Sequence, residues 1–68
     1  MNRFEALERL TMILEYESRK MRDAKELADD KRQHKSKRAN AQFRYEQIKL
    51  DCSAIAIAIM QFNEPENS

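Results

Sequence analysis

The sequence predicts an all-α protein, a two-helix antiparallel hairpin that is coiled-coil-like and is completed by a partner chain or by dimerisation. Three observations lead to this prediction. Charged residues make up 37% of the chain, which has no glycine and one proline, a composition typical of long helices with short connections. Apolar residues recur every three or four positions in two spans of similar length, the period of one helix face. The spans flank one polar segment, as the arms of a helical hairpin do.

The first predicted helix covers residues 3–32. Residues that favour helices dominate this segment, and nothing in it breaks a helix before the polar connection. Its apolar residues fall on one face, which only Glu17 interrupts. That face consists of Leu7, Leu10, Leu14, Met21, Ala24 and Ala28. A weaker apolar group is expected on the opposite side, at Met12, Tyr16 and Leu27.

The connection is expected within residues 29–40, which read "DDKRQHKSKRAN". The turn itself should lie near residues 33–37, with Ser36 or Asn40 as the N-cap of the second helix. Basic residues from Lys31 to Arg38 favour the C-terminal end of the first helix through its dipole. Because helices often end at a glycine, the lack of one leaves an alternative open. This is a single helix of about 60 residues, on the order of 90 Å long, that would have to dimerise.

The second predicted helix covers residues 37–62 and carries a heptad seam. Within it, "SAIAIAIM" alternates like a strand, but a lone strand would leave its backbone groups unpaired. Read as a helix, the span has apolar residues at steps of four and three throughout. This inner seam, expected to pack on the first helix, consists of Ala41, Tyr45, Ile48, Cys52, Ile55, Ile59 and Phe62. Cys52 on the seam should act as a small hydrophobic residue.

A second set of apolar residues lies on the other side of the same helix. Ile57 is rotated by about 160–200° from Ile55 and Ile59. The residues on its side form the outer stripe: Phe43, Leu50, Ala54 and Ile57. A two-helix hairpin can cover only one face of each helix, so the outer stripe is the predicted partner-binding site, and the chain is not expected to be a stable monomer.

Composition argues against several classes of function. One histidine and one cysteine cannot build a structural zinc site, and without glycine there is no phosphate-cradling loop. We therefore expect neither an enzyme nor a cofactor. The formal net charge of +1 gives no overall attraction to nucleic acid or to a membrane.

The expected organisation is one domain over residues 1–63 and a disordered tail over residues 64–68. The opening "MNRFEALERL" lacks the apolar core of a signal peptide. The uncharged apolar run at residues 54–60 is much shorter than the roughly 18 residues of a membrane span. These features lead us to expect a cytoplasmic protein.

The chain also resembles a known family. The similarity rests on the leucine-rich "LERLTMILE", the charged middle, and "QFRYEQIKLDCSAIAIAIMQF", in which an early aromatic residue leads to an apolar end closed by another. In these features the chain resembles the small helical-hairpin co-chaperone subunit for the needle protein of bacterial type III secretion systems. The resemblance implies a larger helical-repeat co-chaperone as partner and a complex that keeps the needle subunit soluble in the cytoplasm.

Two alternatives remain open at this point. One is a dimeric helical-hairpin RNA-binding regulator that forms a four-helix bundle, with basic residues aligned along its outer faces. In this chain the basic residues are clustered in the connection between the helices instead. This placement favours a protein as the partner and makes nucleic acid an unlikely partner. The cluster consists of Lys31, Arg32, Lys35, Lys37 and Arg38. The other alternative is a phage or toxin-neutralising helical module.

Overall fold

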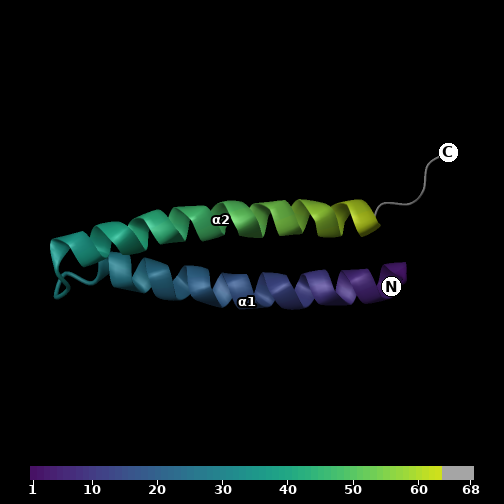
Figure 1. Ribbon diagram of the computed structural model, residues 1–68, viewed down its shortest axis with the longest axis horizontal. Coiled ribbons are helices and arrows are strands. Elements are labelled where there is room, and N and C mark those ends of the chain that lie inside the picture. Colours follow the sequence, from purple (N-terminus) through teal and green to yellow (C-terminus); the bar gives the residue numbers. More distant parts are fainter. Residues whose placement is uncertain (64–68) are drawn as a thin grey trace.

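The computed structural model describes residues 1–63 and contains two α-helices, α1 (Arg3–Asp29) and α2 (Lys35–Asn63). They run antiparallel and side by side, with the loop at one end and the N-terminus beside the end of α2 at the other (Figure 1). The predicted all-α hairpin is confirmed. Its longest dimension is 54 Å, far short of one continuous helix, so that alternative is wrong. The tail expected at residues 64–68 lies outside the described residues.

The start of α1 is capped by Asn2. The Asn2 backbone is extended, and its side-chain oxygen Oδ1 accepts a hydrogen bond of 2.8 Å from the Glu5 backbone N–H. This satisfies one of the N–H groups that have no partner within the first turn. The Glu5 carboxylate in that turn also interacts favourably with the positive end of the helix dipole.

The first helix ends at Asp29, three residues before the expected residue 32. Asp30 has φ −79° and ψ 101°, an extended conformation, and its N–H donates to the Leu27 carbonyl over 3.3 Å. No residue has a positive φ in the part of the chain that the structure describes. The hairpin therefore turns without a left-handed residue, which explains how a chain with no glycine can form it.

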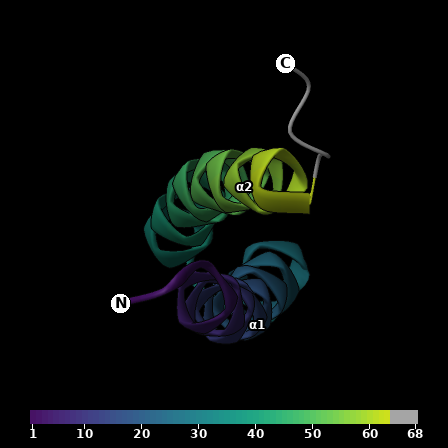
Figure 2. The same ribbon diagram turned by 90° about the vertical axis from the view of Figure 1, so that its right-hand side faces the viewer.

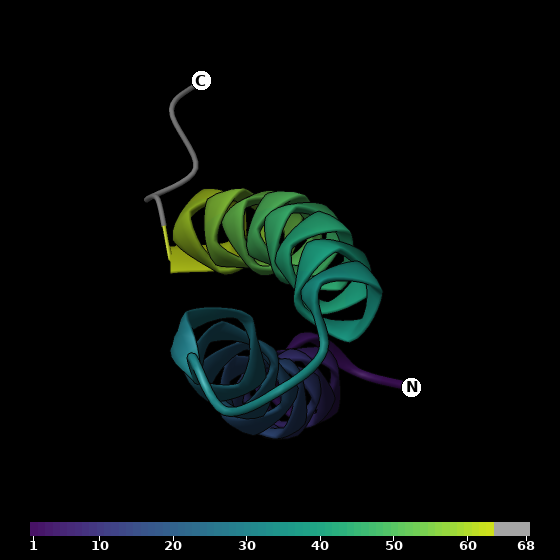
Figure 3. The ribbon, with the colours of Figure 1, turned by 90° about the vertical axis from the view of Figure 1, so that its left-hand side faces the viewer.

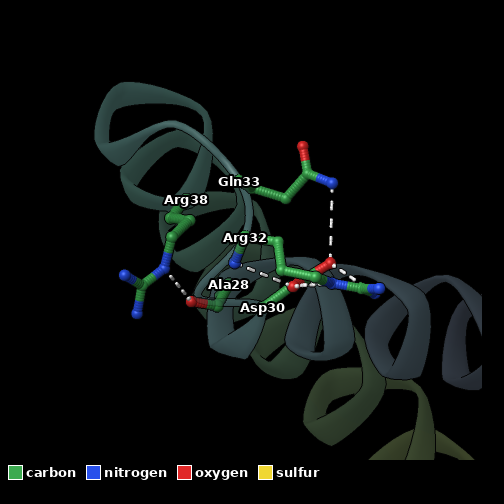
Figure 4. A network of polar contacts seen from close by, with 5 residues as sticks. All are labelled: Ala28, Asp30, Arg32, Gln33 and Arg38. Carbon is green, nitrogen blue, oxygen red and sulfur yellow. Dashed lines mark hydrogen bonds and ion pairs between the residues drawn. The ribbon is translucent and has the colours of Figure 1, made fainter.

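The Asp30 carboxylate organises the loop (Figure 4). Its Oδ1 accepts from both the backbone N–H and the Nε of Arg32, each over 3.0 Å, and its Oδ2 accepts from the Gln33 amide over 3.5 Å. The Asp30 backbone carbonyl accepts from the Gln33 N–H over 3.0 Å. Asp30 thus forms an Asx-type turn that ends α1 before the basic segment can continue it.

Replacing Asp30 by asparagine is expected to reduce the dependence of stability on acid pH. The hydrogen bonds from the Arg32 side chain and then its backbone lower the pKa of Asp30 from 3.8 to about 2. Because the folded-state pKa lies below the unfolded one, the stabilisation is fully present above about pH 4 and is lost as the pH falls through about 2. Thermal unfolding of wild type and Asp30→Asn between about pH 5 and about pH 2 should show their midpoints converging toward acid. A constant difference across that range would contradict the prediction.

The second helix begins at Lys35, two residues before the expected residue 37, and ends at Asn63. The N-cap is His34 and not Ser36 or Asn40, both of which lie inside the helix. The His34 carbonyl accepts from the Arg38 N–H over 3.0 Å, and its ring nitrogen Nδ1 accepts from the Ser36 N–H over 3.2 Å. The imidazole lone pair thus does what a serine or asparagine oxygen usually does at this position.

Arg38 joins the two helices across the loop. Its Nε donates to the Ala28 carbonyl over 3.0 Å (Figure 4). That carbonyl belongs to the last turn of α1, where backbone oxygens have no partner within the helix. One side chain from α2 therefore provides a hydrogen-bond donor for a backbone carbonyl at the end of α1 and links the start of α2 to the end of α1.

The packing between the helices is uneven. We call residues 18–48 the loop half and residues 3–17 with 49–63 the terminal half. Among the residues whose burial the structure describes, the buried apolar ones all lie in the loop half: Ala24, Ala28, Ala41 and Ile48. Three of them are alanines, which let the backbones approach closely. Viewed from either end, the helices wind about each other (Figures 2 and 3), and they diverge from the loop toward the chain ends (Figures 1 and 2).

Candidate protein-interaction surface

The inner seam of α2 faces α1, as the heptad pattern predicts. Ala41 is 0% exposed and Ile48 is 6% exposed. The other members of the seam are half-buried: Tyr45, Cys52, Ile55, Ile59 and Phe62. The loss of burial away from the loop follows the divergence of the helices.

The matching face of α1 shows the same gradient. Its alanines next to the loop are buried, whereas Leu7, Leu10 and Leu14 in the terminal half are only half-buried. Glu17, which interrupts this face, is half-buried, and its carboxylate lies 3.5 Å from the Lys20 ammonium. Near the open end, the Arg3 guanidinium donates to the Phe62 carbonyl. The Arg3 bond joins the two helices where the apolar packing is loose, whereas the Glu17–Lys20 pair lies within α1.

The outer stripe of α2 is exposed. Phe43, Leu50 and Ile57 are 65%, 64% and 57% exposed, and Ala54 is exposed as well. Helical geometry places these four residues on one face, on the side of α2 away from the inner seam. The structure thus brings the predicted residues together on one surface, and their binding role stays a prediction.

Further exposed apolar residues lie in the terminal half. They are Phe4, Met12, Ile13 and Tyr16 on α1 and Met60 on α2. The sequence pattern identified Met12 and Tyr16 but not the other three. A helical spacing could have found two of those, since Ile13 lies three residues before Tyr16 and Met60 three after Ile57.

Leu27 departs from the expected pattern on α1. It is half-buried and lines a shallow groove with Ala24 and Ile48. It therefore flanks the contact between the helices and does not belong to the exposed group of Met12 and Tyr16.

Near its end, over residues 54–60, α2 is apolar on every side. Across residues 50–62 the one charged residue is Asp51, and α1 is the one element that lies beside this segment in the described chain (Figure 1). A helix that is apolar all round is normally surrounded by other helices. Few residues are buried and many apolar ones are exposed, so the isolated chain is a marginal monomer whose apolar surface a partner would cover.

Two bases of the loop cluster are used to build the turn. Arg32 pairs with Asp30 and Arg38 bonds to Ala28, as described above. The lysines at positions 31, 35 and 37 are exposed. Outside the loop, Lys25 lies on α1 with its ammonium 5.3 Å from the Tyr45 ring of α2 and 3.4 Å from the Asp29 carboxylate. The bases of the cluster at residues 31–38 therefore lie at the loop end of the hairpin and not along the length of an outer helix face.

An open groove of about 630 Å³ lies beside the loop half, lined by residues such as Met21, Lys25 and Tyr45, and none of the outer-stripe residues lines it. Within residues 1–63 there is no group of three or more histidine, cysteine or acidic side chains that could hold a metal ion. Neither described helix is long and apolar enough to cross a membrane.

Comparisons of the chain with protein-family models, with curated proteins and with solved structures each found no match. The fold and the surface therefore define the class of protein: a small helical hairpin with few buried residues and an apolar, exposed terminal half.

Proposed function

We propose that this hairpin is a protein-interaction module that is completed by helices of a partner chain. The observation that carries the proposal is the end of α2, where residues 54–60 are apolar all round but have one helix beside them. A partner helix on the outer stripe would remove Leu50, Ala54 and Ile57 from water together.

The energies support this role. Full burial of a side chain such as Phe, Leu or Ile stabilises by roughly 1.5–3 kcal/mol. Since Phe43, Leu50 and Ile57 are each more than half exposed, covering them would contribute about 3–6 kcal/mol. A single core of this size rarely supplies more than about 3–5 kcal/mol. Partner binding could therefore stabilise the hairpin as much as its own core does.

The narrower proposal is a co-chaperone. In this role the hairpin binds a larger helical chaperone and helps to keep a type III secretion needle subunit soluble in the cytoplasm. The support is the hairpin fold together with the resemblance described above, in which Phe43 and Phe62 bracket the apolar part of α2. A helical-repeat partner would suit the hairpin, because such proteins offer extended concave surfaces.

The RNA-binding alternative has less support, because of the five bases in the cluster only the lysines at positions 31, 35 and 37 are without a contact in the turn. Phosphate contacts need side chains that are free to reach the backbone of the nucleic acid, and Arg32 and Arg38 are already engaged within the loop.

Copurification with matched variants tests the function. The tagged wild type, Ile57→Asp and Met12→Asp would be expressed in the native host, and the proteins that copurify would be quantified by mass spectrometry. Both substitutions place a charge at an exposed apolar residue, but only Ile57 belongs to the outer stripe. We expect a helical protein bound at a fixed ratio to wild type and Met12→Asp and lost from Ile57→Asp.

The co-chaperone proposal also predicts what that partner and the hairpin do together. Coexpression of the hairpin with it should keep a third, aggregation-prone helical subunit in the soluble fraction. Equal recovery of the partner by wild type and Ile57→Asp would contradict binding through the outer stripe. A partner that leaves the third subunit insoluble would contradict the chaperone role alone.

A further inference from the structure

The outer stripe is self-complementary in its spacing. Phe43, Leu50 and Ile57 are seven residues apart, so these three large residues of the stripe are symmetric about Leu50, whereas Ala54 then faces Glu46 of the other copy. When a second α2 is laid antiparallel on it, Leu50 meets Leu50 of that copy and Phe43 meets Ile57. A two-fold interface requires this property, because the same patch must serve both protomers.

The charges beside the stripe are compatible with self-association. Glu46 and Lys49 lie along one flank of the stripe, Arg44 and Asp51 lie along the other, and all four are exposed. Each flank therefore carries one acid and one base. A two-fold axis at Leu50 sets each flank against the same flank of the other copy, so the facing flanks together carry no net charge. Lys49 and Asp51, one residue from Leu50, each lie near their own counterpart across the axis.

The surface area that two copies would bury on each other is typical of a reversible dimer. We take about 200 Å² for a phenylalanine and about 100 Å² for an aliphatic side chain. With the exposed fractions of Phe43, Leu50, Ile57 and Met60, each copy offers about 300 Å² of apolar area. Interfaces are little more than half apolar, so the two copies together would bury about 1,000 Å², near the lower limit for a specific interface.

We propose that a second copy of this chain covers the outer stripe in the free protein. The α2 helices of the two copies pack antiparallel, centred on Leu50, so that each α2 lies between its own α1 and the α2 of the other copy. The inference rests on the proposed function in one respect, the use of the outer stripe for binding. It makes the free hairpin a homodimer whose second copy must leave before another partner can bind there.

Disulfide formation between single cysteines tests the geometry. In a Cys52→Ala background, Leu50→Cys should form a disulfide-linked dimer, because the two-fold axis brings position 50 next to itself, and a disulfide needs Cα atoms within about 7 Å. Phe43→Cys should not link to itself, since the two positions are about 21 Å apart along the helices. A mixture of Phe43→Cys and Ile57→Cys should link. Glu8→Cys, exposed on α1, is the control for random collision.

Two results would overturn the proposal. If Phe43→Cys links to itself as readily as Leu50→Cys, the helices are parallel. If Leu50→Cys links no faster than Glu8→Cys, the stripe is not an interface between copies. This test does not depend on whether a charged variant can still fold.

The mass in solution gives an independent check. Light scattering should show the 8.1 kDa chain approaching twice that mass as its concentration rises through the micromolar range. Ile57→Asp should weaken association by roughly a hundredfold or more, since an unpaired charge in the contact costs several kcal/mol, whereas Met12→Asp should leave it unchanged. A folded wild type that stays monomeric at all concentrations would overturn the homodimer. It would leave the proposed function standing if a partner still copurifies through the outer stripe.

Discussion

Replacing Ile48 by aspartate is expected to abolish the helical hairpin. Ile48 is 6% exposed and is the largest of the four residues that are buried in the described part of the chain. Leaving a charge buried without a partner typically costs about 3–5 kcal/mol, which is as much as a single core of this size supplies. The variant should therefore lose most of its helical signal in far-ultraviolet circular dichroism at a temperature where wild type is folded.

Gln47→Asp is the matched control for this experiment. It introduces the same side chain one residue earlier, at an exposed position on the side of α2 away from the inner seam. We expect it to keep the wild-type helix content, because charges on solvated helix faces change stability by little. If Ile48→Asp melts at the same temperature as Gln47→Asp, the loop half is not the core of this protein.

Enlarging Ala41 should also destabilise the hairpin, by a different mechanism. Ala41 is 0% exposed and lies in the half where the helices approach most closely. Ala41→Leu adds three carbon atoms to that contact, and overpacking of this kind typically costs about 1–3 kcal/mol. Because the core is small, the midpoint of urea unfolding should fall markedly.

Ala54→Leu makes the same substitution on the outer stripe and serves as its control. Ala54 is exposed, so the larger side chain meets no neighbour within the hairpin, and leucine favours helix as well as most residues do. The midpoint should stay the same or rise. Equal destabilisation by both substitutions would show that helix propensity, and not close packing at Ala41, controls stability.

The arrangement of the helices was predictable because it depends on periodicity. The steps of four and three from Ala41 to Phe62 place the seam of α2 against α1, and the offset of Ile57 from Ile55 places the outer stripe on the far side. The set of residues on each face of α2 follows from this spacing and does not depend on the conformation of the loop. The pattern therefore identified both faces of α2 correctly.

The helix ends were not predictable in the same way, because individual hydrogen bonds determine them. Asp30 ends α1 by accepting from Arg32 and Gln33, and His34 caps α2 with a ring nitrogen. Propensity scales favour serine and asparagine as caps and do not foresee a histidine. The exposure of Ile13 and Phe4 depends on how far the helices diverge, which periodicity does not specify.

The gradient in packing has a consequence for the dynamics of the chain. Local unfolding costs least free energy where few apolar contacts are buried, which here means the terminal half, and most beside the loop with its buried alanines and Ile48. Amide protons near Leu7 and Ile59 should therefore exchange with solvent through fraying of the chain ends, and those near Ala24 and Ala41 only when the whole hairpin opens. A helical partner would then bind a hairpin whose helices are packed beside the loop and loosely held at the chain ends. Ordering of the terminal half would be coupled to binding.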